Sequence, residues 1–203
     1  MYRKYIKRLL DLILSFFALI ILGIPLILFA VIIKLTSKGP VLFWQKRLGA
    51  NKTTFMMPKF RTMYTDAPPE MPTHLLSDPN RWITPAGRIY RQFSIDELPQ
   101  LFSIFTGKMS FIGPRPALWN QTDLIAERDK YGANDIRPGL TGWAQINGRD
   151  ELEIEEKARL DGEYAERLSF LFDCRCFFGT VAAVLRQDGV VEGGTGAMSH
   201  GKK

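Results

Sequence analysis

Cysteine and histidine are scarce in this chain of 203 residues, which has two of each. Cys174 and Cys176 are separated by one residue, a spacing that suits neither a disulfide framework nor a tetrahedral zinc site. We therefore interpret them as reduced thiols in a cytoplasmic environment. His74 and His200 lie in loop-like sequence, so a histidine-based catalytic triad or a zinc enzyme is disfavoured.

Acidic residues are nearly absent from the first 61 positions, which hold eleven Lys and Arg against the single Asp11. The other positions hold sixteen basic and twenty acidic residues, so the net charge of +6 combines a +10 segment with a −4 segment. A basic excess at one end indicates an anionic surface there and argues against a uniformly cationic nucleic-acid binder. We expect anionic membrane lipids, and no nucleic acid, among the partners.

Charge is absent from the run Leu12–Ile33, whose 22 residues as a straight helix would measure about 33 Å and could cross a bilayer. Pro25 lies inside this run and removes a helical hydrogen bond, so we expect a kink or break that leaves each half too short to span. Lys and Arg flank both ends, whereas a spanning segment usually shows an asymmetry. The residues leave two topologies open, a spanning helix and a re-entrant helix-break-helix.

Strand-like runs at 41–49 and 54–63 flank a turn-like Ala-Asn-Lys and predict a hairpin. Thr84 and Pro85 have the residue types of a helix N-cap and first helical position. Residues 108–113 are strand-like.

Two further helical patterns lie towards the C-terminus. Residues 151–168 predict an acidic amphipathic helix, which we interpret as a solvated face rather than a metal site. The apolar run 170–185 is interrupted by two charges, so it either packs in the core or lies in the membrane interface.

Ser94 and Glu97 have the spacing of a capping box, and the predicted helix stops at Gly107. Asp96 and Glu97, the acidic pair, allow two interpretations. Acidic residues in a first turn commonly offset the positive end of a helix. Alternatively, a helix N-terminus keeps an aspartate ionised and suits a carboxylate that attacks or holds phosphorus. Pro99 removes one early hydrogen bond, so an irregular start is expected.

Arg115 lies between two prolines that fix the backbone on either side, which suits either a phosphate anchor or an ordinary exposed loop. The segment Arg137–Asp150 carries three glycines and two arginines. Such glycines permit a close ligand approach or a tight turn, and their spacing matches neither a Walker nor a dinucleotide loop.

Together these motifs resemble the bacterial sugar transferases of the small monotopic phosphoglycosyl transferase type. The resemblance covers nearly the whole chain: KRLLDLILS, the proline-broken apolar segment, PKFRTM, SIDELPQLF, GKMSFIGPRP, RPGLTGWAQINGR and LSFLFD. It implies a helix-rich α/β (α+β) membrane-associated domain with an N-terminal proline-broken re-entrant membrane helix and interfacial amphipathic helices. Many members carry Ser-Pro at the break, where this chain has Ile24-Pro25.

The same resemblance implies an activity. A phosphosugar would pass from a UDP-sugar to undecaprenyl (polyprenyl) phosphate with release of UMP, using Mg²⁺ and a covalent aspartyl-phosphosugar intermediate. This is the initiating step of glycoconjugate, exopolysaccharide or lipopolysaccharide assembly, at the bacterial inner membrane with the catalytic part facing the cytoplasm.

The resemblance also assigns roles to individual residues. Asp96 would be the nucleophile and a magnesium ligand, and Glu97 would position groups or assist proton transfer. The substrate-binding residues would be Lys59 for phosphate or the magnesium-bound cluster, Arg91 for the lipid phosphate, and Arg115 and Arg149 for the donor diphosphate.

We expect three parts: a membrane-embedded helix-break-helix over 1–36, a cytoplasmic catalytic domain over 37–188 and a flexible tail over 189–203. An alternative of another class is a non-catalytic membrane adaptor bound to anionic lipid. A glycosyl transferase that releases UDP is a further alternative. The sugar, the glycan pathway, a homo-oligomeric state and the role of the loop 64–82 stay open.

Overall fold

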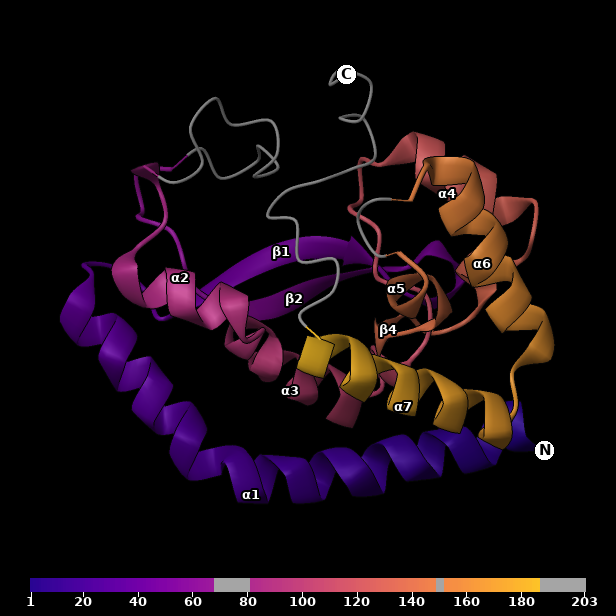
Figure 1. Cartoon of the computed structure of the whole chain (residues 1–203), viewed down its shortest axis with the longest axis horizontal. Helices are drawn as coiled ribbons and strands as arrows, with labels where there is room; N and C mark the ends of the chain where they lie inside the picture. Colours follow the sequence, from indigo (N-terminus) through magenta and orange to yellow (C-terminus); the bar gives the residue numbers. More distant parts are fainter. Residues whose placement is uncertain (68–80, 149–151, 187–203) are drawn as a thin grey trace.

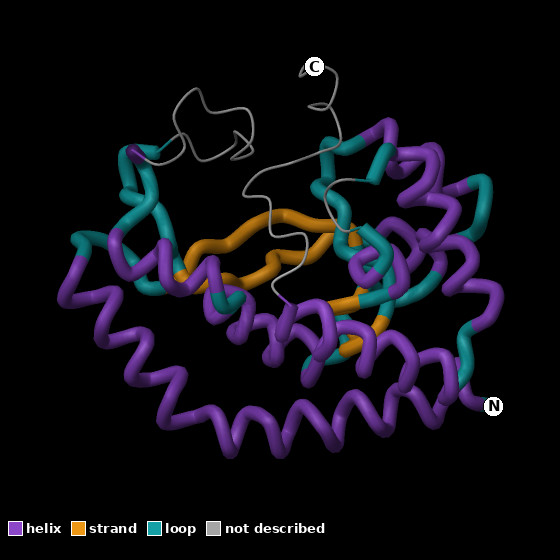
Figure 2. The backbone as a smooth tube through the Cα atoms, viewed as in Figure 1, coloured by secondary structure: helices purple, strands orange, loops and turns teal. Residues whose placement is uncertain are grey.

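The computed structural model describes residues 1–67, 81–148 and 152–186 (Figure 1). Helices make up most of these residues and surround the short strands, which confirms the helix-rich α/β class (Figure 2). The helices are α1 (Lys7–Thr36), α2 (Pro85–Gln92), α3 (Leu101–Phe105), α4 (Thr122–Asp129), α5 (Trp143–Ile146), α6 (Ile154–Arg167) and α7 (Phe170–Arg186). A π-helical turn, Tyr2–Ile6, precedes α1, and 3₁₀ helices occupy Ala50–Lys52, Ile95–Gln100 and Ala133–Asp135. The predicted tail, 189–203, lies outside the described residues.

The predicted hairpin is confirmed as the antiparallel pair β1 (Leu42–Leu48) and β2 (Thr54–Phe60). Asn51 in the connecting turn has a φ of 52°, a left-handed conformation that asparagine tolerates better than most residues. Phe55 and Met57 of β2 are buried against α3. Because side chains alternate along a strand, Lys59 projects from the same face of β2 as these two residues.

A second pair of strands is parallel, β3 (Ser110–Ile112) beside β4 (Gly139–Thr141). A Cβ at Gly139 would lie 2.1 Å from the Gly113 nitrogen, and one at Gly142 would lie 2.1 Å from the Gly113 oxygen. Side chains at either position would force the strands apart. These two glycines therefore serve the close approach of one backbone to another, a use different from the ligand approach and the tight turn that the sequence left open.

Helix α1 continues through Pro25 and is bent (Figure 1), so of the predicted kink or break the structure has the kink. A proline removes a single helical hydrogen bond, and the flanking turns keep theirs. The two arms of α1 both contact the remainder of the protein. On the N-terminal arm, the Asp11 carboxylate accepts hydrogen bonds from the Ser110 hydroxyl and the Phe111 amide, both at 3.1 Å. On the C-terminal arm, the Phe29 carbonyl accepts one from the Tyr90 hydroxyl at 3.0 Å.

The outward side of α1 is apolar and exposed. Among the described residues, one helical stretch, Tyr2–Thr36, is long and apolar enough to cross a membrane. Its large exposed side chains include Leu14, Phe16, Phe17, Ile20, Ile21, Ile24, Ile27, Leu28 and Val31. A soluble protein rarely exposes so continuous an apolar patch, so this face indicates contact with another apolar phase.

The N-terminal arm is anchored to α7 through the Asp173 carboxylate. Lys7 Nζ lies 2.7 Å from one of its oxygens, which also accepts a hydrogen bond from the Tyr2 hydroxyl at 2.5 Å. The Tyr164 hydroxyl donates to the other oxygen at 2.6 Å. Asp173, the last residue of the LSFLFD motif, therefore joins α7 to Lys7 of α1, 166 residues away in the sequence.

The sequence predicts that helix α7 either packs in the core or lies in the membrane interface, and the helix has one buried face and one exposed apolar face. Phe172 and Cys176 are buried in the core beside Tyr164. Phe177 and Phe178 are exposed. The helix thus packs on the domain through one face and presents an apolar second face.

Helix α6 is solvated on only part of its surface. Glu155, in the first turn, is exposed, as the sequence predicts for this acidic helix. Asp161, by contrast, is 1% exposed and forms an ion pair with Arg128 of α4 at 2.5 Å. The interpretation of the whole helix as a solvated face is therefore wrong for this residue, because the charge of Arg128 compensates its burial.

Candidate active site

The acidic pair lies in the 3₁₀ helix Ile95–Gln100, between α2 and α3. The predicted capping box is wrong, because Ser94 has a left-handed backbone with a φ of 54° and makes no side-chain cap. The predicted irregular start is confirmed: Pro99 lies inside the 3₁₀ turn, which becomes α-helical only at Leu101. The helix ends before Gly107, whose φ is 82°, as expected.

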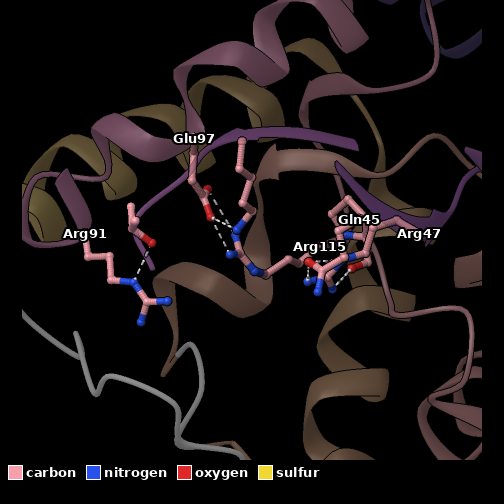
Figure 3. Close-up of polar contacts among 8 residues, drawn as sticks. Gln45, Arg47, Arg91, Glu97 and Arg115 are labelled. Atoms are coloured by element: carbon pink, nitrogen blue, oxygen red, sulfur yellow. Dashed lines mark hydrogen bonds and ion pairs between the residues drawn. The ribbon is translucent and has the colours of Figure 1, made fainter. Parts of the chain in front are cut away.

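Glu97 binds two cations instead of capping its own helix (Figure 3). Lys59 Nζ lies 2.9 Å from its Oε1, and Arg115 donates to Oε1 at 2.6 Å and to Oε2 at 3.3 Å. The Glu97 side chain is 16% exposed. Burial alone raises the pKa of Glu97, but Arg115 and Lys59 outweigh it and hold the pKa well below its usual range. Glu97 is therefore a fixed anion with both oxygens engaged.

Asp96 is in a different state. Within residues 1–67, 81–148 and 152–186, it forms no hydrogen bond and no ion pair. Burial raises the pKa of Asp96 to about 6, with a contribution from Glu97 and opposition from Lys59 and other cations. The sequence predicts that the helix N-terminus favours the ionised form, but desolvation is the larger effect and raises the pKa, so the aspartate is mostly ionised only above about pH 6. The result is a carboxylate with unused oxygen lone pairs at neutral pH.

The predicted cations surround this pair from separate elements. Lys59 comes from β2, Arg91 from α2 and Arg115 from the loop after β3. Arg91 donates from Nε to the Thr62 hydroxyl at 2.9 Å, and its charge lowers the pKa of Asp96. Three cations against two carboxylates leave a formal charge of +1, which favours an anionic ligand. Arg149 lies outside the described residues.

Sequence reasoning missed Gln45 and Arg47, which lie on the side of Arg115 away from Glu97 (Figure 3). The strand register pairs Phe43 with Lys59, so alternation places Gln45 and Arg47 on the same face as Lys59. That pattern is present in the sequence and becomes informative once the hairpin register is known.

The residues also allow a test of whether magnesium fits. No group of three or more His, Cys, Asp and Glu side chains capable of holding a metal ion occurs in the described part of the chain. Glu97 is occupied by cations, which leaves Asp96 as the carboxylate of the pair with free coordination capacity. Mg²⁺ commonly binds one or two carboxylates, keeps several waters and takes its other ligands from substrate phosphates. The donor set therefore fits a magnesium ion shared with a phosphorylated substrate.

Comparison with known proteins gives the site its context. Residues 2–187 match the family described as bacterial sugar transferase. An uncharacterized sugar transferase named EpsL from Bacillus subtilis (strain 168) is 37% identical, over 91% of this chain and 90% of the relative.

Two longer relatives have more specific names. The undecaprenyl-phosphate glucose phosphotransferase of Komagataeibacter xylinus is 40% identical over 86% of this chain and 35% of its own length. The UDP-glucose:undecaprenyl-phosphate glucose-1-phosphate transferase of Escherichia coli (strain K12) is 34% identical over 88% of this chain and 40% of its own length. The chain thus spans less than half of these two proteins. The family match over nearly the whole chain, together with a relative of nearly equal extent, shows that this protein is an enzyme of the bacterial sugar transferase family.

Proposed function

We propose that this enzyme transfers a sugar phosphate from a UDP-sugar to undecaprenyl phosphate and releases UMP. The observation that carries the proposal is that the two carboxylates of the acidic pair differ in their partners. Glu97 is neutralised by Lys59 and Arg115, whereas Asp96 has free oxygens within the field of the same cations. The names of the relatives, which are phosphotransferases acting on undecaprenyl phosphate, support the same substrate class.

In the first half-reaction, a carboxylate oxygen of Asp96 attacks the β-phosphorus of the UDP-sugar. The bond between that phosphorus and the bridging oxygen breaks, and UMP leaves with the electron pair. The product is an aspartyl phosphosugar, which is a mixed anhydride. An anionic nucleophile can approach a diphosphate only where cations reduce the repulsion, and Lys59, Arg91 and Arg115 supply positive charge here.

In the second half-reaction, a phosphate oxygen of undecaprenyl phosphate attacks the same phosphorus. The acyl phosphate bond breaks, the Asp96 carboxylate is regenerated and the lipid leaves as a diphosphate-linked sugar. Covalent catalysis lets a soluble donor and a lipid acceptor use one site in turn. We assign Arg91 to the lipid phosphate, and Arg115 and Arg149 to the donor diphosphate.

Magnesium, when bound, supplies charge neutralisation on the diphosphate. Asp96 is the protein ligand that we assign to it. Glu97 contributes by holding Lys59 and Arg115 at fixed positions beside the reacting phosphates.

We further propose that α1 enters and leaves the membrane from the cytoplasmic side of the bacterial inner membrane. Both arms of α1 contact the same domain, through Asp11 on one arm and Phe29 on the other. A straight spanning helix would separate these ends by the thickness of the bilayer. Basic residues near both ends suit an anionic lipid surface on one side.

The exposed face of α7 extends the same membrane contact. Phe177 and Phe178 project from a helix whose opposite face is fixed to the core by Cys176 and Phe172. A helix with one apolar exposed face of this kind suits the interface between headgroups and acyl chains. This supports the predicted interfacial helix.

The function is tested by supplying purified protein in detergent with Mg²⁺ and sugar-labelled UDP-glucose, UDP-galactose or UDP-N-acetylgalactosamine without acceptor. We expect release of UMP with label retained on Asp96, and transfer of that label once undecaprenyl phosphate is added. Release of UDP would replace the proposal with whole-glycosyl transfer. Lipid binding without any nucleotide product would favour the membrane adaptor.

A further inference from the structure

The backbone that carries Arg115 has an unusual shortage of hydrogen-bond donors. Pro114 and Pro116 lack N–H groups, so the run 114–117 offers four carbonyls but only two amides. A regular strand ladder cannot hold such a segment. Each of its carbonyls is nevertheless bonded, by Gly139 N to Pro114, Arg128 to Arg115, Arg47 to Pro116 and Leu48 N to Ala117.

Two of these donors are backbone amides that extend neighbouring strands. Gly139 N reaches the Pro114 oxygen at 2.8 Å, and Leu48 N reaches the Ala117 oxygen at 3.0 Å. The two carbonyls between them, those of Arg115 and Pro116, accept from arginine side chains instead. Guanidinium groups thus replace backbone donors at the residue whose side chain binds Glu97.

The guanidinium of Arg47 is fixed by a neighbour on its own strand as well as by its bond to the loop. Its Nε and one terminal nitrogen donate to the Gln45 Oε1 at 3.1 and 2.6 Å. The other terminal nitrogen donates to the Pro116 carbonyl at 2.8 Å. The planar guanidinium directs these donors along fixed directions, which a lysine cannot do. Figure 3 shows Arg115 between Glu97 on one side and the Gln45–Arg47 pair on the other.

Arg128 approaches the loop from α4. It donates to the Arg115 carbonyl at 3.0 Å and binds Asp161 of α6 through two nitrogens, at 2.8 and 2.5 Å. Arg128 is 3% exposed and Asp161 1% exposed. The ion pair compensates both buried charges and leaves one guanidinium nitrogen for the loop.

We propose that Arg47 and Arg128 are positioning residues that fix Arg115 for the reaction. The Arg115 side chain is 40% exposed, so its rotamers are not held by packing alone. Holding the carbonyls of residues 115 and 116 fixes the point from which the guanidinium reaches Glu97 and, under the proposed function on which this inference rests, the donor diphosphate. A small displacement of such a group is costly because the reacting phosphates require it at one position.

The test compares Arg47→Met with Lys46→Met, which removes the same charge from the opposite face of the same strand. Donor kcat/KM is measured with saturating acceptor, and amide exchange is followed by mass spectrometry at residues 115, 117 and 118. We expect Arg47→Met to lower donor kcat/KM about tenfold and to speed exchange in the loop. We expect Lys46→Met to stay within about twofold of the unaltered protein in both measurements.

A double-variant comparison separates positioning from general damage. If Arg47 acts through Arg115, then adding Arg47→Met to Arg115→Met changes kcat/KM by less than about twofold. Arg47→Lys keeps the charge but loses the planar set of guanidinium donors. We therefore expect an amide exchange rate and a kcat/KM between those of the unaltered protein and Arg47→Met. Arg128→Lys provides the same comparison from the other side of the loop.

Equal behaviour of Arg47→Met and Lys46→Met, or fully multiplicative losses with Arg115→Met, would overturn the inference. Absence of UMP release by the unaltered protein with every UDP-sugar would overturn the proposed function instead. In that case the exchange data still decide whether Arg47 holds the loop.

Discussion

Two carboxylates in this protein each receive several donors, and they differ in the charge that results. Glu97 binds Lys59 and Arg115 and has Asp96 beside it. Arg91 is a third cation near this pair, so the region keeps a surplus of positive charge. Asp173 binds one cation, Lys7, and two neutral phenols, and the Asp11 carboxylate lies within the field of the same lysine, so this region has no surplus of positive charge. The first region has charge available for an anionic ligand and the second does not.

Burial follows the same division. Lys7 and Asp173 have side chains 9% and 10% exposed, whereas Arg115 in the Glu97 region is 40% exposed. The buried Asp173 cluster joins parts of the fold, and its ion pair and hydrogen bonds compensate the hydration that its members lose on burial. A charged, half-open cluster stays accessible to substrate. Substitutions should therefore reduce activity in one region and stability in the other.

The largest difference between the effect on activity and the effect on stability is expected from Asp96→Asn. The amide keeps the size of the carboxylate but is a far weaker nucleophile, so turnover should fall by about 10³-fold or more. Because Asp96 has no partner among the described residues and its burial disfavours the charge, thermal stability at neutral pH should rise rather than fall. UMP release and a thermal unfolding scan in the same detergent check both statements. Full turnover in this variant would exclude the covalent route.

Asp173→Asn should produce the opposite pattern. It leaves Lys7 buried beside an uncharged group, at a cost of about 3 kcal/mol in the free energy of unfolding. Activity per folded molecule should remain near normal. Asp129→Asn is the matched control, because its pair with Lys52 is exposed on both sides and should contribute less than about 1 kcal/mol. Denaturant titration of both variants measures the difference, and equal losses would remove the distinction between the two regions.

The raised pKa of Asp96 predicts a pH effect on stability. Its carboxyl group has a pKa of about 6 in the fold and an ordinary value of 3.8, so the folded protein binds the proton more tightly. The free energy of unfolding should therefore fall as pH rises from about 4 to about 6, by about 1–2 kcal/mol. Unfolding is measured in EDTA without substrate, and Asp96→Asn should flatten this part of the profile. An unchanged slope in Asp96→Asn would show that another group produces it.

The smallest effect is expected from Tyr2→Phe, which removes one hydrogen bond to Asp173 and leaves Lys7 in place. We expect a loss of about 1 kcal/mol in the free energy of unfolding and no change in activity. Tyr5→Phe serves as the control, since Tyr5 is 62% exposed. The same denaturant titration separates them, and a loss as large as that of Asp173→Asn would show that the Tyr2 hydrogen bond stabilises the Asp173 carboxylate as much as the Lys7 ion pair does.

Local patterns in the sequence predicted local structure well. The hairpin, the Thr84 cap and the stop at Gly107 depend on neighbouring residues, and the structure contains all three. Thr84, for example, accepts a hydrogen bond from the Gly87 amide, as an N-cap should. The motifs also identified the acidic pair and the cations Lys59 and Arg115 that the fold brings together.

The errors arose where distant residues compete with local ones. Glu97 has the right spacing to cap its helix, but two cations from other elements offer stronger, charge-assisted bonds. Asp161 belongs to a helix that the sequence predicted to be solvated, but α4 packs on α6 and brings Arg128 to it. No local pattern reveals such partners, because each pair is created by the tertiary fold.

The bond between Lys7 and Asp173 also has a consequence for the order of synthesis. The ribosome makes Lys7 before Asp173, and 166 positions separate them. During translation α1 is made long before its partner on α7, so this bond forms only after the contacts of Asp11 with Ser110 and Phe111 have become possible. A contact between residues so distant in the sequence closes a long loop and is therefore expected late in folding.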